Sequence, residues 1–156
     1  MNEHGFIKAV HRHLSPEVYR WKIHDTFTGG VPDAFYMGPA GSLFVEYKYV
    51  KLPKKLDTTV KFNLSALQTI WLTRALDYGQ LVAVIIGFEK SAVALTNSAS
   101  FSGMTKRELQ DEAVSFQQIA KLIENHVLSR GYNRGNTTTK SGTKSPSPVG
   151  REKNKI

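Results

Sequence analysis

The sequence predicts an α/β fold, in which a mixed β-sheet is flanked by helices. Two observations predict this class. Alternating and continuous apolar runs indicate strands, and amphipathic segments between them indicate helices. A strand–helix–strand unit in the middle of the chain should return a parallel strand to the sheet. We expect one domain over residues 1–129, in the order helix, three strands, helix, two strands, helix, and a disordered basic tail over residues 130–156.

The first two predicted elements are a helix and a half-exposed strand. The helix covers residues 3–14 and ends before Pro16. Its apolar face consists of Phe6, Ile7, Val10 and Leu14. The strand covers residues 19–27, where bulky and polar side chains alternate, and it ends at the pair Gly29-Gly30.

The next two predicted strands form a hairpin, at about 32–37 and 42–50, around the turn sequence Gly-Pro-Ala-Gly. If the turn is residues 38–41, Met37 lies opposite Ser42 and Asp33 lies directly across from Glu46. Their Cβ atoms would be about 4.5–5.5 Å apart. Lys48 falls on the same face of its strand as Glu46, because side chains alternate along a strand.

The remaining elements follow from caps and apolar runs. Ser65 and Gln68 form a capping box that opens a helix ending at Gly79. Its predicted apolar face consists of Ile70, Trp71, Ala75 and Leu76. The run at 80–88 is continuously apolar, which indicates a strand buried on both faces. A further strand at 91–97 and a helix at 105–128, in one or two pieces, complete the domain.

Composition excludes several classes of protein. The chain has no cysteine, so it has neither a disulfide nor a thiolate metal site. No Walker A, GxGxxG or GxSxG motif occurs, and the five histidines lack zinc-site spacing, so we expect them on the surface. The N-terminal segment has no continuous apolar core, and no apolar run is long enough to span a membrane. We therefore expect a cytoplasmic protein without a membrane partner.

The two carboxylates of the hairpin predict a metal site. Two carboxylates at this distance repel each other unless one is protonated or a cation lies between them. Mg²⁺ takes oxygen ligands, commonly one or two carboxylates with water and phosphate. Taken singly, Glu-x-Lys is common on solvated strands and Pro-Asp is a turn signal. The combination of Asp33, Glu46 and Lys48 on one face favours a metal-dependent phosphodiesterase.

This combination, Gly30-Val31-Pro32-Asp33 followed by Val45-Glu46-Tyr47-Lys48, resembles the PD-(D/E)xK nuclease superfamily. Within it, the chain is most similar to the virus-type replication-repair nuclease (VRR-NUC) group, which resembles Holliday-junction resolvases. The resemblance covers about residues 3–90 and implies the restriction-endonuclease-like α-β-β-β-α-β core. The basic tail has no counterpart in that group.

The resemblance implies roles for particular residues. It implies that Asp33, Glu46 and the Tyr47 carbonyl are the ligands of a Mg²⁺ or Mn²⁺ ion and that Lys48 is the catalytic lysine. The acid of the first helix corresponds to Glu3. The helix dipole alone also favours an acidic residue at this N-terminal position. The Ser…Gln pair of the group corresponds to Ser65 and Gln68, which the capping box alone also explains.

The implied activity is an Mg²⁺-dependent DNA endonuclease that nicks or cuts duplex DNA, of a type carried by phages or mobile elements. The resemblance also admits a homodimer. Three alternatives stay open: a branched-DNA resolvase, a ribonuclease, and a non-catalytic DNA-binding module on a nuclease scaffold.

Positive charge indicates a polyanionic partner. The chain has a net charge of +8, and residues 130–156 hold seven Lys or Arg and one Glu. A lysine-rich loop leaves the strand of Glu46 directly. A charge run is usually a solvated loop, but this position favours contacts with the DNA backbone. The lysines concerned are Lys51, Lys54, Lys55 and Lys61.

Overall fold

A computed structural model of the chain describes residues 1–129. The prediction of a disordered tail at 130–156 lies outside the described residues. In chain order the elements are α1 (Glu3–His11), β1 (Tyr19–Lys22), β2 (Ala34–Gly38), β3 (Gly41–Tyr49), β4 (Thr59–Lys61), α2 (Ala66–Asp77), β5 (Val82–Phe88), β6 (Ser91–Leu95), the 3₁₀ turn η1 (Ser98–Ser100), β7 (Gly103–Thr105), α3 (Lys106–Asp111), β8 (Val114–Ser115) and α4 (Phe116–Leu128).

The main sheet has six strands in the order β1-β2-β3-β5-β6-β8. Strands β3 and β5 are parallel and are connected through α2, whereas the other neighbours are antiparallel. The mixed sheet and its parallel return are therefore confirmed. A separate two-stranded sheet of β4 and β7 was not predicted, because three-residue strands are too short to show an alternating pattern.

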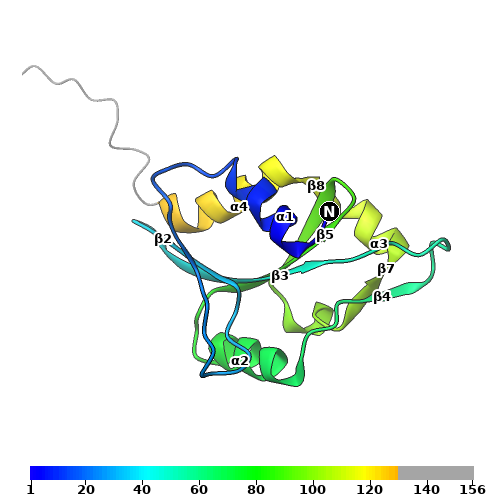
Figure 1. The fold of residues 1–156 in the computed structure, drawn as a ribbon, viewed down its shortest axis with the longest axis horizontal. Helices are drawn as coiled ribbons and strands as arrows, with labels where there is room; N and C mark the ends of the chain where they lie inside the picture. The colour runs from blue at the N-terminus through cyan, green and yellow to red at the C-terminus, as the bar shows by residue number, and fades with distance from the viewer. Residues whose placement is uncertain (130–156) are drawn as a thin grey trace, which may run out of the picture.

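Helices cover both faces of the main sheet, with α1 and α4 on one face and α2 on the other (Figure 1). Every residue of β5 is buried, as the continuous apolar run predicted. Ala83 and Ile85 pack toward α1 and α4, and Val84 and Ile86 pack toward α2. The sheet thus separates two apolar cores, and β3 runs between them beside β5.

Two helix predictions hold, and one needs correction. The apolar face of α1 is buried, although the helix ends at His11 and Leu14 lies in the turn beyond it. In α2 the capping box is formed, and Gly79 follows the helix with φ +77°. The predicted face of α2 is wrong at Ile70, which is exposed. Ala75 is buried as predicted, and Trp71 and Leu76 are half-buried against the same core. Leu72 is buried and was not predicted, so the buried face is shifted from Ile70 toward Leu72.

The hairpin has the predicted register, with Met37 opposite Ser42 and Ala34 opposite Val45. Strand β1 is shorter than predicted, and all four of its residues are exposed at the edge of the sheet. The last predicted helix forms in two pieces, α3 and α4, with the two-residue strand β8 between them. In the part of the chain that the structure describes, no helix combines the length and apolarity needed to cross a membrane.

Candidate active site

The hairpin places Asp33 close to Glu46, and the Glu46 side chain faces α2. Asp33 directly precedes β2, and its Oδ2 accepts a hydrogen bond of 2.9 Å from the Tyr47 N–H. Its backbone carbonyl accepts a hydrogen bond of 2.8 Å from the Ile23 N–H, so Asp33 is held from both sides. Because Ala34 pairs with Val45, continuing the register places Asp33 across from Glu46.

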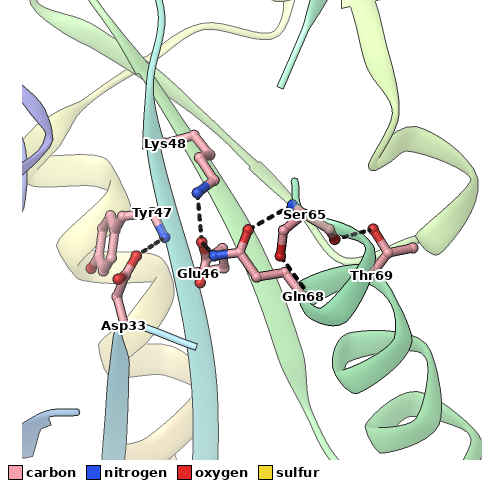
Figure 2. A network of polar contacts seen from close by, with 7 residues as sticks. All are labelled: Asp33, Glu46, Tyr47, Lys48, Ser65, Gln68 and Thr69. Carbon is pink, nitrogen blue, oxygen red and sulfur yellow. Dashed lines mark hydrogen bonds and ion pairs between the residues drawn. The ribbon is translucent and has the colours of Figure 1, made fainter. Parts of the chain in front are cut away.

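Glu46 is 1% exposed, and no other charged side chain within residues 1–129 is buried. Its Oε1 accepts hydrogen bonds from Lys48 Nζ at 2.8 Å and from Gln68 Nε2 at 2.5 Å (Figure 2). Its Oε2 is buried, and within the described residues it has no hydrogen-bond partner. A buried polar atom without a partner costs about 1–3 kcal/mol, and more when it is charged. This oxygen is therefore suited to bind a cation.

Burial raises the pKa of Glu46 to about 7. The hydrogen bond and charge of Lys48 oppose this rise, whereas the negative charges of Asp33 and Glu3 add to it. A divalent cation would reverse the balance, because it stabilises the charged form of every carboxylate around it. The site thus concentrates more negative charge than Lys48 neutralises.

Gln68 contributes to the site and to the helix cap at the same time. Its Oε1 accepts a hydrogen bond from the Ser65 N–H at 2.9 Å, which closes the capping box. Its Nε2 donates to Glu46 (Figure 2). The two interpretations of the Ser65–Gln68 pair are therefore compatible, and the N-terminus of α2 is anchored to β3 through the Glu46 carboxylate.

The Tyr47 carbonyl lies on the Asp33 side of β3. In an extended strand, the N–H and C=O of one residue point to the same edge. The Tyr47 N–H points to Asp33, and the N–H groups of Phe44 and Val50 bond to carbonyls at the opposite edge. Asp33, Glu46 and this carbonyl together form a set of oxygen donors of the kind that Mg²⁺ and Mn²⁺ prefer, so the residues fit such an ion.

Glu3 lies at the edge of this site. Burial raises the pKa of Glu3, and the negative charge of Asp33 adds to the rise, whereas Lys48 and Lys22 lower it. Glu3 is therefore close enough to sense both Asp33 and Lys48. Within residues 1–129, however, no three His, Asp or Glu side chains gather closely enough to hold a metal ion. Metal ligation by Glu3 stays a prediction.

Gly30 ends the predicted first strand and opens the Gly-Val-Pro-Asp motif, and the structure adds a packing role for it. It has φ +86°, and a Cβ added to it would lie 2.3 Å from the Leu67 carbonyl oxygen and 2.8 Å from the Gln68 nitrogen. Only glycine allows this approach. It packs the loop that leads to Asp33 against the first turn of α2, so the two sides of the site meet there.

A buried polar network supports β3 from the opposite face of the sheet. His11 Nε2 lies 2.6 Å from the Tyr36 hydroxyl, which lies 2.7 Å from the Tyr47 hydroxyl. Burial lowers the pKa of His11 to about 4, with help from the charges of Arg20 and Lys22. His11 is thus half-buried rather than fully at the surface, and through the Tyr36 hydroxyl it supports Tyr47, whose backbone N–H contacts Asp33.

The four lysines predicted to contact DNA are all exposed. Their loop is fixed at its base, because the N–H groups of Lys106 and Arg107 donate to the carbonyls of Thr58 and Leu56. Lys51 and Lys61 line an open groove of about 460 Å³ beside the end of β3. Contact of these lysines with DNA stays a prediction.

No family model matches the chain, and no curated protein does. Among solved structures, it is similar to Archaeoglobus fulgidus Hjc, a Holliday junction resolvase from an archaeal hyperthermophile. The identity is 12%, the similarity covers 76% of this chain and 96% of that chain, and the TM-score is 0.48.

Proposed function

We propose that this chain is a DNA endonuclease that hydrolyses phosphodiester bonds with Mg²⁺ or Mn²⁺. One observation supports the proposal above all: the buried Oε2 of Glu46 has no partner within residues 1–129, although Asp33 and Lys48 lie beside it. A structural ion pair between Glu46 and Lys48 would not require a second carboxylate or leave a buried oxygen unpaired. Buried ion pairs contribute little net stability even when all their atoms are bonded.

Each residue of the site has a separate role in this proposal. Asp33, Glu46 and the Tyr47 carbonyl would hold the ion. When bound, Mg²⁺ supplies positive charge to the phosphoryl oxygens and makes water more acidic. Gln68 fixes Glu46 Oε1 and so leaves Oε2 free for the ion.

Lys48 supplies the second positive charge of the site. Its side chain is 19% exposed, so its ammonium group lies between the buried Glu46 and solvent. From there it can orient the attacking water and stabilise the charge that develops on the phosphate. In this role Lys48 is a catalytic residue rather than a metal ligand.

DNA is the proposed substrate because the chain has a net charge of +8 and exposed lysines next to the site. We take the products to be nicked strands if the protein is a monomer, and paired cuts if it dimerises. A branched-DNA resolvase would use the same chemistry with a preference for junctions. The substrate is therefore a separate question from the reaction, and one experiment addresses both.

The test is cleavage of a supercoiled plasmid and of a labelled four-way junction, with Mg²⁺ or EDTA, by the wild-type and Glu46→Gln proteins. We expect Mg²⁺-dependent conversion of at least one DNA by the wild type and at least a 100-fold slower reaction in the variant. Cleavage of the junction alone would identify a resolvase. Binding to both DNAs without any cleavage would contradict the proposal and would indicate a non-catalytic DNA-binding module.

A further inference from the structure

Phe27 is the most exposed large apolar residue in the described part of the chain, at 98% exposure. It lies in the connection between β1 and β2, which extends beside α2 in Figure 1. Single exposed apolar residues are ordinary on protein surfaces. This one differs because its loop is fixed on both sides and ends at the candidate active site.

The backbone of Phe27 is held by a local turn. Asp25 Oδ1 accepts hydrogen bonds from the Phe27 N–H at 2.8 Å and from the Thr28 N–H at 3.1 Å. On the other side of Phe27, a Cβ on Gly29 would lie 2.5 Å from Leu67 Cδ1, so the loop packs directly on α2. The phenyl ring is therefore presented to solvent by a structured loop.

This loop also fixes how far Phe27 is from the site. Phe27 is three residues from Gly30, so their Cα atoms are at most about 11 Å apart. Gly30 packs on the backbone of Gln68, whose side chain binds Glu46. Because a DNA strand advances about 3.4 Å per nucleotide, Phe27 can reach a base within a few nucleotides of the bond that is cut.

We propose that Phe27 stacks on an unpaired base of the DNA and so directs the nuclease to sites where a base has left the helical stack. This inference rests on the proposed function. A phenyl ring has no hydrogen-bonding group to read base edges, and both faces of a base inside a duplex are already covered by its neighbours. Stacking on an unpaired base is the contact that remains, and it is independent of sequence.

A second copy of the chain is a weaker candidate for this position. A stable interface buries about 800 Å² on each partner, which one phenyl ring at the tip of a loop does not provide. Phe27 is also flanked by the polar residues His24, Asp25 and Thr28. Lys22 and Lys48 lie close enough to Glu3 to lower its pKa, so they add positive charge at the candidate site itself, which suits a nucleic acid strand.

The test is a double-mutant cycle between Phe27 and one base, measured by binding. All proteins carry Lys48→Ala, so that the DNA is not cut. The dissociation constant is measured for duplexes with one unpaired nucleotide, placed at successive positions, and for the same duplexes with an abasic site there. With Phe27 present, we expect the base to be preferred about tenfold at one position, the effect of a single base–aromatic stack.

The variants separate stacking from other effects. Phe27→Ala should remove the preference for the base, and Phe27→Trp should keep it. Tyr78→Ala is the matched control, because Tyr78 is 74% exposed at the far end of α2, and this variant should behave as its parent. The inference would be overturned if, at every position of the unpaired nucleotide, the protein with Phe27 and the Phe27→Ala variant showed the same preference for the base over the abasic site.

Two further outcomes have distinct meanings. If Phe27→Ala converts a dimer to a monomer in sedimentation and does not change the preference for the base, Phe27 is a self-association contact and the inference is overturned. If the cycle succeeds but the protein with Lys48 intact cuts none of these DNAs in Mg²⁺, the stacking role stands and the proposed nuclease function fails. The two claims are thus tested separately.

Discussion

Glu46 carries most of the electrostatic cost of the site. It is buried next to another carboxylate, and Lys48 compensates for only part of its charge. Natural proteins retain such costs mainly where function needs them. The buried carboxylate should therefore lower the stability of the metal-free protein, and this effect can be measured.

Replacing Glu46 with Gln should stabilise the metal-free fold above pH 7. The pKa of Glu46 is about 7 in the folded state, against 4.5 as the ordinary value. The folded state therefore binds more protons between these values, and its stability decreases as the pH rises through 7. In thermal unfolding with EDTA at pH 8, we expect the free energy of unfolding of Glu46→Gln to be about 2 kcal/mol higher than that of the wild type. This difference should disappear toward pH 4.5. A wild type that is the more stable protein at pH 8 would contradict this.

Residue identities were predictable at the site, but residue environments were not. Asp33, Glu46 and Lys48 follow from the hairpin, because a short turn fixes the register and the register fixes which side chains share a face. The burial of Glu46 and its unpaired oxygen depend on α2, which is remote in sequence. His11 and Phe27 carry no local pattern that separates them from ordinary surface residues.

The site is assembled by three elements: the β2–β3 hairpin, the loop before it, and the first turn of α2. The hairpin and the parallel return through α2 were predictable from local patterns. The exact buried face of α2 was not, since the helix has apolar residues on more than one side and tertiary packing buries Leu72 and leaves Ile70 exposed. The short strands β4, β7 and β8 depend on pairing with distant segments.

Gly30→Ala should both destabilise the fold and weaken the site. Gly30 and Gly79 both have positive φ, so alanine at either position costs about 1 kcal/mol in backbone strain. A Cβ at Gly30 additionally collides with the backbone of α2, whereas one at Gly79 meets nothing within 4 Å. In urea unfolding, we expect a loss of about 3 kcal/mol for Gly30→Ala and about 1 kcal/mol for Gly79→Ala. Equal losses would show that the close packing on α2 contributes nothing.

The network behind β3 should make the fold sensitive to acid. Because the pKa of His11 is about 4 in the folded state, against 6.5 as the ordinary value, the unfolded state binds more protons between them. This stabilisation is complete above pH 6.5 and is lost as the pH falls through 4. After allowance for the partial exposure of His11, we expect acidification to lower the free energy of unfolding by about 1 kcal/mol.

The comparison that checks this is unfolding of His11→Gln and His13→Gln over pH 4–7. His11→Gln should flatten the dependence, and the exposed His13 provides a control whose replacement should leave it unchanged. An acid dependence that persists in His11→Gln would show that another group is responsible.

At the scale of the whole molecule, the candidate site and the four lysines predicted to contact DNA lie on one side of the sheet. The face with α2 and the loop after β3 carries the candidate site and four exposed lysines, whereas α1 and α4 cover the opposite face (Figure 1). The net charge of +8 attracts DNA to the whole surface, but only some lysines should contact phosphates. Contact through Lys51, Lys54, Lys55 and Lys61 stays a prediction from the sequence, which did not predict that α3 fixes their loop.

Salt dependence tests which face binds DNA. Each phosphate contact contributes about 0.9 to the slope of log affinity against log salt concentration. Lys54→Gln with Lys55→Gln should therefore reduce the slope by about 2. Lys8→Gln with Lys121→Gln removes the same charge from exposed positions on α1 and α4 and should leave the slope nearly unchanged. Equal reductions in both pairs would show that binding is not confined to the proposed face.

The central claim is that Asp33 and Glu46 hold a divalent cation that Lys48 does not bind. The most direct test is a titration of Mn²⁺ by electron paramagnetic resonance into the wild type, Asp33→Asn and Lys48→Ala, together with cleavage by each protein. We expect one strong site in the wild type, its loss in Asp33→Asn, and its retention in Lys48→Ala without cleavage. Strong Mn²⁺ binding in Asp33→Asn, or normal cleavage by Lys48→Ala, would contradict the account.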